Sequence, residues 1–147
     1  MNVKELNIPA GTGREDIKVR EKIIKGFYAR WIAEHPDKKV WNDDLGEYIH
    51  VKYLSINETY NKAARRYEST IAVLRLTELL NKAIKVAEKS TKPGDRNQKS
   101  FEKLLIMRYE DIKLTVGVQR STGDKVQYSV TAIGNAGKQK ATAKSDG

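Results

Sequence analysis

The sequence predicts an α+β fold in which two main helices pack on a mostly antiparallel sheet of about four strands. Apolar residues recur at helical spacing after residue 14, which predicts a helix over about 14–35. A second window is apolar on most sides and predicts a helix over about 69–89. Apolar and polar residues then alternate from 112 to 133, which predicts that the fold ends in a β-meander.

A chain of 147 residues can bury an adequate core in one domain. We expect an extended lead-in over residues 1–13, a single α+β domain over 14–133 and a disordered basic tail over 134–147. The tail is rich in Gly, Ala and Lys and has no large apolar side chain to anchor it.

The first helix has a start signal and a stop signal. Thr12 is the expected N-cap, and Glu15 three residues later completes a capping box. The helix should end near His35, because Pro36 disfavours helical geometry in the residue before it. We interpret His35 as a residue whose charge suits the helix C-terminus, with a catalytic role as the alternative.

After a turn and a short edge strand at Val40–Asn42, a strand is predicted over residues 48–54. His50 and Lys52 are two residues apart and therefore lie on one face of that strand. An imidazole beside a fixed positive charge can exchange a proton and hold a phosphate. The alternative interpretation is an exposed polar face of a basic protein.

The long helix over 69–89 follows a second capping-box pattern at Ser55–Glu58 and a short helical or loop segment. Because its apolar residues cover most of the circumference, more than one neighbour should bury it, and Leu76 and Leu80 at its centre should be buried. Residues 90–100 contain Pro, Gly and several basic residues, which predicts a mobile basic loop.

The meander strands are predicted at 104–109, 112–119 and 126–133, with turns between them. One face of the meander should pack on the helices. The side chains expected on the other face are Lys113, Thr115, Gln119, Gln127, Ser129 and Thr131.

Composition narrows the function. The net charge of +9 suggests an anionic partner, most simply nucleic acid. The absence of cysteine excludes disulfides, thiolate catalysis and cysteine zinc sites, and the two histidines form no metal motif. There is no phosphate loop, no Gly-x-Ser-x-Gly and no apolar run long enough for a membrane span. We expect a cytoplasmic protein with no cofactor, no metal and no membrane partner.

The remaining polar residues suit RNA. Metal-free RNA cleavage needs a base for the 2′-hydroxyl, an acid for the leaving oxygen and cations for the phosphorane. His50 has the ordinary pKa range for proton transfer, and tyrosines can stack on bases, although Tyr67 at helical spacing also fits half-buried packing. The expected catalytic residues are His50, Lys52 and Thr131. The expected nucleic-acid-binding residues are Tyr60, Lys62, Arg65, Arg66, Thr70, Lys113, Tyr128 and Ser129.

The order helix, strand, long helix, basic loop and meander over about residues 40–133 resembles the barnase–EndoU–colicin–RelE-like nuclease superfamily. More narrowly, it resembles the branch found in phage and conjugative-element polyvalent proteins, including the large polyvalent protein-associated domains. Residues 48–51, 69–84 and 126–133 carry the resemblance. It implies a basic or histidine position on the early strand, here His50 or Lys52, and a hydroxyl or aromatic position on the last strand. Candidates for the last position are Tyr128, Ser129 and Thr131.

The resulting hypothesis is an RNA-acting domain of mobile-element origin, a metal-independent endoribonuclease-like toxin or effector. The alternatives are a non-catalytic RNA- or protein-binding module on the same scaffold, or a structural domain cut from a larger polyvalent protein. The expected partners are RNA or another nucleic acid and an immunity or antitoxin protein. The nuclease hypothesis requires His50 and a last-strand hydroxyl to face each other across one cleft.

Overall fold

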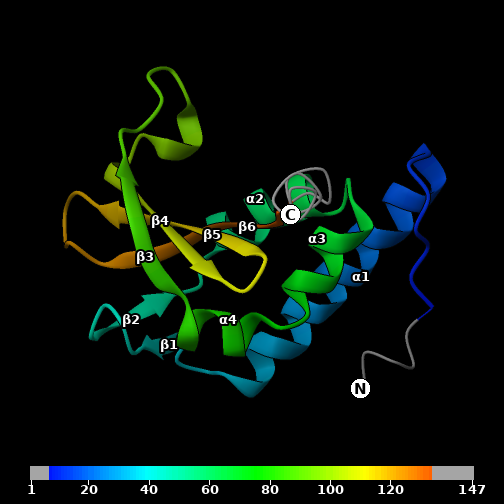
Figure 1. Cartoon of the computed structure of the whole chain (residues 1–147), viewed down its shortest axis with the longest axis horizontal. Helices are drawn as coiled ribbons and strands as arrows, with labels where there is room; N and C mark the ends of the chain where they lie inside the picture. The colour runs from blue at the N-terminus through cyan, green and yellow to red at the C-terminus, as the bar shows by residue number, and fades with distance from the viewer. Residues whose placement is uncertain (1–6, 134–147) are drawn as a thin grey trace, which may run out of the picture.

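The computed structural model describes residues 7–133, so the lead-in before residue 7 and the tail predicted at 134–147 lie outside the described residues. Within this range there are four α-helices and a six-stranded sheet (Figure 1). The α-helices are α1 (Arg14–Glu34), α2 (Tyr53–Ala63), α3 (Tyr67–Val73) and α4 (Leu76–Lys82). The strands are β1 (Lys39–Asn42), β2 (Glu47–His50), β3 (Ile84–Lys89), β4 (Phe101–Tyr109), β5 (Ile112–Gln119) and β6 (Lys125–Ala132).

The sheet order is β1-β2-β6-β5-β4-β3. The α+β class and the closing meander β4-β5-β6 are confirmed, but the sheet has more strands than predicted. It is also mixed, because β2 and β6 run parallel while the other neighbouring strands are antiparallel. In Figure 1, α1 and α3 lie together on one side of the sheet, and the loop after β3 projects beyond the end of the strands.

The predicted long helix over 69–89 is wrong. The structure divides this segment into α3, α4 and the edge strand β3. The amide of Asn42 donates to the carbonyls of Leu80 (2.8 Å) and Ala83 (2.9 Å), which satisfies acceptors at the end of α4. Residues 84–89 then pair with β4, so sheet hydrogen bonds replace the helical ones. Leu76 and Leu80 are fully buried, as predicted.

The strand predicted over 48–54 is shorter than expected. It ends at His50, and Lys52 is the N-cap of α2. The Lys52 N–H donates to the Ser55 hydroxyl (2.9 Å), so Ser55 is the third residue of α2 and not its cap. The cap of α1 was also misplaced, since Gly13 and not Thr12 holds that position. The end of α1 at Glu34, before His35, agrees with the prediction.

One irregularity of the meander changes which side chains face the helices. Thr115 pairs with Ser129 but Val116 pairs with Gln127, so Tyr128 is an extra residue in β6. Gln127, expected on the polar face, is therefore turned to the helices and fully buried. Its side chain accepts from the hydroxyl of Tyr28 in α1 (2.8 Å) and donates to that of Thr59 in α2 (2.6 Å).

The two sides of the sheet carry separate apolar clusters. The main core combines the helices with residues of β2, β4, β5 and β6. A smaller cluster contains Phe101, Leu104, Val126 and Tyr128, with Leu54 of α2 packed against it. Thr115 and Ser129 were expected on an open face but are 7% and 8% exposed, so they are not presented to solvent. None of the helices within residues 7–133 is long and apolar enough to cross a membrane.

Candidate functional site

A buried carboxylate lies where α2 meets the loop between β3 and β4. Glu58 and Lys62 are one helical turn apart, which places both on one face of α2. Glu58 is 6% exposed, and its Oε1 lies 3.2 Å from the Lys62 ammonium nitrogen. That oxygen forms no hydrogen bond among the described residues, while Oε2 accepts from the amide of Asn97. Glu58 therefore keeps an open acceptor beside a cation.

The phenol of Tyr128 joins this group from β6. Its ring packs edge-on against Phe101, with centroids 5.9 Å apart, and the Lys62 ammonium lies 5.3 Å from the ring centroid. Burial raises the pKa of Tyr128 to about 12, the hydrogen bond from Gln98 partly opposes this rise, and the charge of Glu58 adds to it. The hydroxyl therefore stays protonated at neutral pH and can donate a hydrogen bond.

The basic loop over residues 90–100 is folded by its own hydrogen bonds. Gln98 is 8% exposed, and its carbonyl accepts from the Lys92 N–H (2.6 Å). Asp95 accepts from the Asn97 N–H (2.9 Å) and caps the short 3-10 helix Arg96–Gln98. These contacts anchor the loop over Tyr128, because Gln98 also donates to the phenol oxygen (3.4 Å).

Beside this polar group the loop forms a basic cavity of about 400 Å³. Its cationic lining residues are Lys92, Arg96, Lys99 and Arg120, and all of them are exposed. None of these cations forms an ion pair with a carboxylate within residues 7–133. Unpaired positive charges around one hollow favour an anion with several charges, such as a polyphosphate chain.

The structure does not bring the three expected catalytic residues together. His50 pairs with Val126, whereas Thr131 lies five residues further along β6, which is about 16 Å at the rise of a strand. Lys52 lies at the other end of the sheet from Thr131, where its ammonium donates to the Gln119 side chain (2.9 Å). The geometry therefore does not meet the requirement for His50 and Thr131 to share one cleft.

Two of the expected binding residues, Lys62 and Tyr128, belong to the polar group beside the basic cavity. Thr70 is buried and donates to the carbonyls of Ala63 (3.1 Å) and Arg66 (3.0 Å), so its hydroxyl serves packing. Ser129 is buried opposite Thr115, and Lys113 is exposed opposite Thr131.

Three further expected residues lie around α2 and away from the basic cavity. The ring of Tyr60 lies under the Lys25 ammonium (4.2 Å). Arg66 donates to the carbonyl of Ala132 (3.1 Å), and Arg65 lines a separate pocket between α1 and α2.

Sequence reasoning missed Glu58, Asn97, Gln98 and Arg120. The i,i+4 spacing of Glu58 and Lys62 was a usable signal for the first of these. No local pattern marks Gln98, because its role depends on the loop folding back onto Tyr128.

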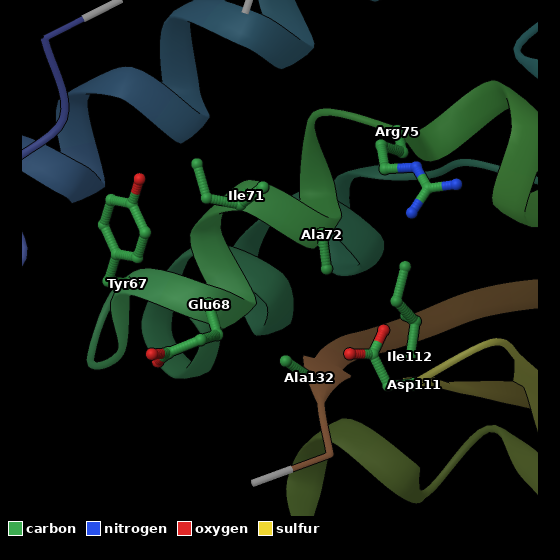
Figure 2. A pocket seen from close by; sticks show the side chains of 8 residues that line it. All are labelled: Tyr67, Glu68, Ile71, Ala72, Arg75, Asp111, Ile112 and Ala132. Carbon is green, nitrogen blue, oxygen red and sulfur yellow. The ribbon is translucent and has the colours of Figure 1, made fainter. Parts of the chain in front are cut away.

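A second hollow of about 200 Å³ lies between α3 and the start of β5. Figure 2 shows Ile71, Ala72 and Ile112 on its walls, with Arg75 and Asp111 toward one side. Arg75 is already neutralised by Glu78 (3.1 Å) and Glu110 (3.0 Å), which raise the pKa of its guanidinium. A cation held by two carboxylates is a poor phosphate ligand, so we place the candidate site at the basic loop.

The fold and this site define an α+β domain with a basic cavity beside a buried polar group. No group of three or more His, Asp or Glu side chains in the described part of the chain is arranged to hold a metal ion. The chain belongs to the family described as large polyvalent protein-associated domain 3, which matches residues 20–128. It is therefore a mobile-element-associated domain of polyvalent proteins, as the narrower resemblance predicted. No curated protein and no solved structure matches the chain.

Proposed function

We propose that this domain binds RNA by gripping its phosphate backbone at the basic cavity. The observation that carries the proposal is a set of four cations around one hollow of about 400 Å³ that form no ion pair with a carboxylate within residues 7–133. They are Lys92, Arg96, Lys99 and Arg120. Each cation that replaces a condensed counterion on the nucleic acid adds a salt-dependent increment to binding. Such contacts position the strand and do not read its sequence.

The test is a binding titration at several salt concentrations. Replacing the four cations by alanine should weaken RNA binding at low salt by more than about 10-fold and flatten the dependence of log Kd on log salt by about 3 units. The control, which removes two exposed cations from α1, is Lys22→Ala with Arg30→Ala, and it should leave the slope nearly unchanged. Equal losses in the control and in the four-cation variant would refute the assignment of the cavity.

The second candidate function is metal-independent RNA cleavage at the adjacent polar group. The specific observation is Glu58, whose buried Oε1 accepts no hydrogen bond within residues 7–133 and lies 3.2 Å from the Lys62 ammonium, with Tyr128 beside this pair. A carboxylate so placed can accept the proton of a 2′-hydroxyl. Lys62 can stabilise the phosphorane, and the protonated Tyr128 can give its proton to the leaving 5′-oxygen.

Cleavage is tested with wild type, Glu58→Gln and His50→Ala on one RNA pool in the presence of EDTA. If the polar group is the active centre, Glu58→Gln should reduce the rate by about 10²-fold or more at nearly unchanged affinity. Loss of activity in His50→Ala alone would instead assign the proton transfer to His50. No cleavage by wild type between about pH 5 and 9 leaves RNA binding as the function.

An immunity or antitoxin partner belongs to this second candidate. A ribonuclease endangers the cell that makes it, so the cell needs an inhibitor. An inhibitor with an acidic surface would complement the positive charge of the basic cavity, which is lined by Lys92, Arg96, Lys99 and Arg120.

A further inference from the structure

The β1–β2 hairpin presents two large aromatic side chains to solvent. Trp41 is 45% exposed and Tyr48 is 44% exposed, and the two residues are register partners. Their rings meet edge to face, with centroids 5.2 Å apart and an interplanar angle of 81°. Two large rings exposed side by side offer flat apolar surface to a binding partner.

Lys39 and His50 lie next to this aromatic pair on the same two strands. The Lys39 ammonium lies 4.3 Å from the centroid of the Tyr48 ring, and Lys39 pairs with His50. Because residues two apart point the same way and register partners share a face, Lys39, Trp41, Tyr48 and His50 lie on one face of the hairpin. The opposite face carries Ile49, which is fully buried in the main core.

This row continues toward the basic cavity. The backbone is still extended at Lys52 (φ −118°, ψ 176°), so its side chain follows those of Tyr48 and His50 on the same side. The Lys52 ammonium binds the Gln119 side chain, and the next residue, Arg120, lines the cavity. Figure 1 shows the turn between β5 and β6 lying between the hairpin and the loop after β3.

We propose that this row of side chains is a track, that is, a linear binding surface, for single-stranded RNA. Unpaired bases stack on Trp41 and Tyr48, and the sugar-phosphate backbone runs past Lys52 to Arg120. This proposal rests on the proposed RNA binding, and it specifies that the bound RNA is single-stranded. Stacking of a base on an aromatic side chain strengthens binding and needs a free base face. The bases of a duplex are already stacked on one another, so a duplex can use only the cationic end of the track.

Positive charge at both ends of the row argues that its binding partner is a nucleic acid. Lys39 stands beside the aromatic pair, and Lys52 and Arg120 continue the row toward the cavity, where cations outnumber the one carboxylate of the lining, Asp95. Aromatic rings bind the flat faces of unpaired bases, and neighbouring cations bind the phosphates that link them. A single-stranded nucleic acid carries both kinds of group.

The experiment compares a single-stranded RNA with its own duplex at one salt concentration. The Trp41→Ala/Tyr48→Ala variant should lose about 10-fold or more in affinity for the single strand, with an unchanged salt slope and little change for the duplex. The Trp41→Phe/Tyr48→Phe variant keeps flat rings and should retain most of the affinity. The control is Val86→Ala, an equally exposed apolar residue on the edge strand β3 (53% exposed).

Tryptophan fluorescence gives a second readout. The chain has two tryptophans, and Trp31 is 3% exposed in the core, so quenching of wild type by the single strand reports on Trp41. Binding of strand and duplex that is unaffected by Trp41→Ala/Tyr48→Ala would overturn the track but leave the basic cavity as the RNA site. Absence of binding to either RNA would overturn the proposed function itself.

Discussion

Arg20 is a fully buried arginine whose charge is compensated by backbone carbonyl groups. Its guanidinium donates to the carbonyls of Ala64 (2.7 Å), Pro9 (2.7 Å), Gly11 (2.8 Å) and Arg65 (3.3 Å). One side chain of α1 therefore ties the chain entering the domain to the turn between α2 and α3. We predict that Arg20→Met destabilises the fold strongly.

The magnitude follows from these bonds. A hydrogen bond from a charged donor contributes about 1.5–3 kcal/mol, but the cost of desolvating the guanidinium offsets part of the sum. Water can replace the donor at the exposed Gly11, whereas Ala64 is fully buried and its carbonyl would lose the Arg20 donor. We therefore expect Arg20→Met to lower the free energy of unfolding by about 3–5 kcal/mol.

Urea unfolding of wild type, Arg20→Met and Arg20→Lys measures this loss. Lysine has a single ammonium and cannot span carbonyls on two sides, so its variant should fall between the other two. The control is Arg14→Met at the exposed start of α1, which should change stability by less than about 0.5 kcal/mol. A loss below about 1 kcal/mol in Arg20→Met would refute the assigned role of the carbonyl cluster.

Three further predictions concern Gly117 and the buried tyrosines. A Cβ at Gly117 would lie 2.6 Å from carbon atoms of the Phe101 ring, so Gly117→Ala should cost about 1–3 kcal/mol in thermal unfolding. Gly13→Ala, where a Cβ meets nothing within 4 Å, is its control, and equal melting temperatures would contradict the prediction. Tyr28→Phe removes the donor to Gln127 and should cost about 1–3 kcal/mol. Burial raises the pKa of Tyr28, and that of Tyr128 to about 12, above the ordinary 10.0. The unfolded chain therefore ionises first, so stability should be constant just below pH 10.0 and fall as the pH rises above it, with a smaller fall in Tyr28→Phe. Urea midpoints across this range test the sign, and a rise above pH 10.0 would contradict it.

Local signals in the sequence were sufficient for α1 and for the meander. The apolar stripe before His35 and the strict alternation in β5 are periodic over enough residues to specify a helix and a strand without knowledge of their partners. The resemblance to the polyvalent-protein domains was also drawn from the sequence, and the match over 20–128 shows that family. Net charge likewise suggested an anionic partner, which stays a prediction, but it carried no information on where such a partner would bind.

The tertiary structure decided β3 and the positions of the site residues. Residues 84–89 form a strand because β4 offers them hydrogen bonds, and Asn42 from β1 satisfies acceptors at the end of α4. The irregularity in β6 turns Gln127 inward and Tyr128 toward the loop, which reverses the faces expected from alternation. A one-residue bulge carries almost no sequence signal, yet it moves every side chain beyond it to the other face, because strand side chains repeat every two residues. Glu58, Gln98 and Tyr128 therefore meet only after the sheet is assembled.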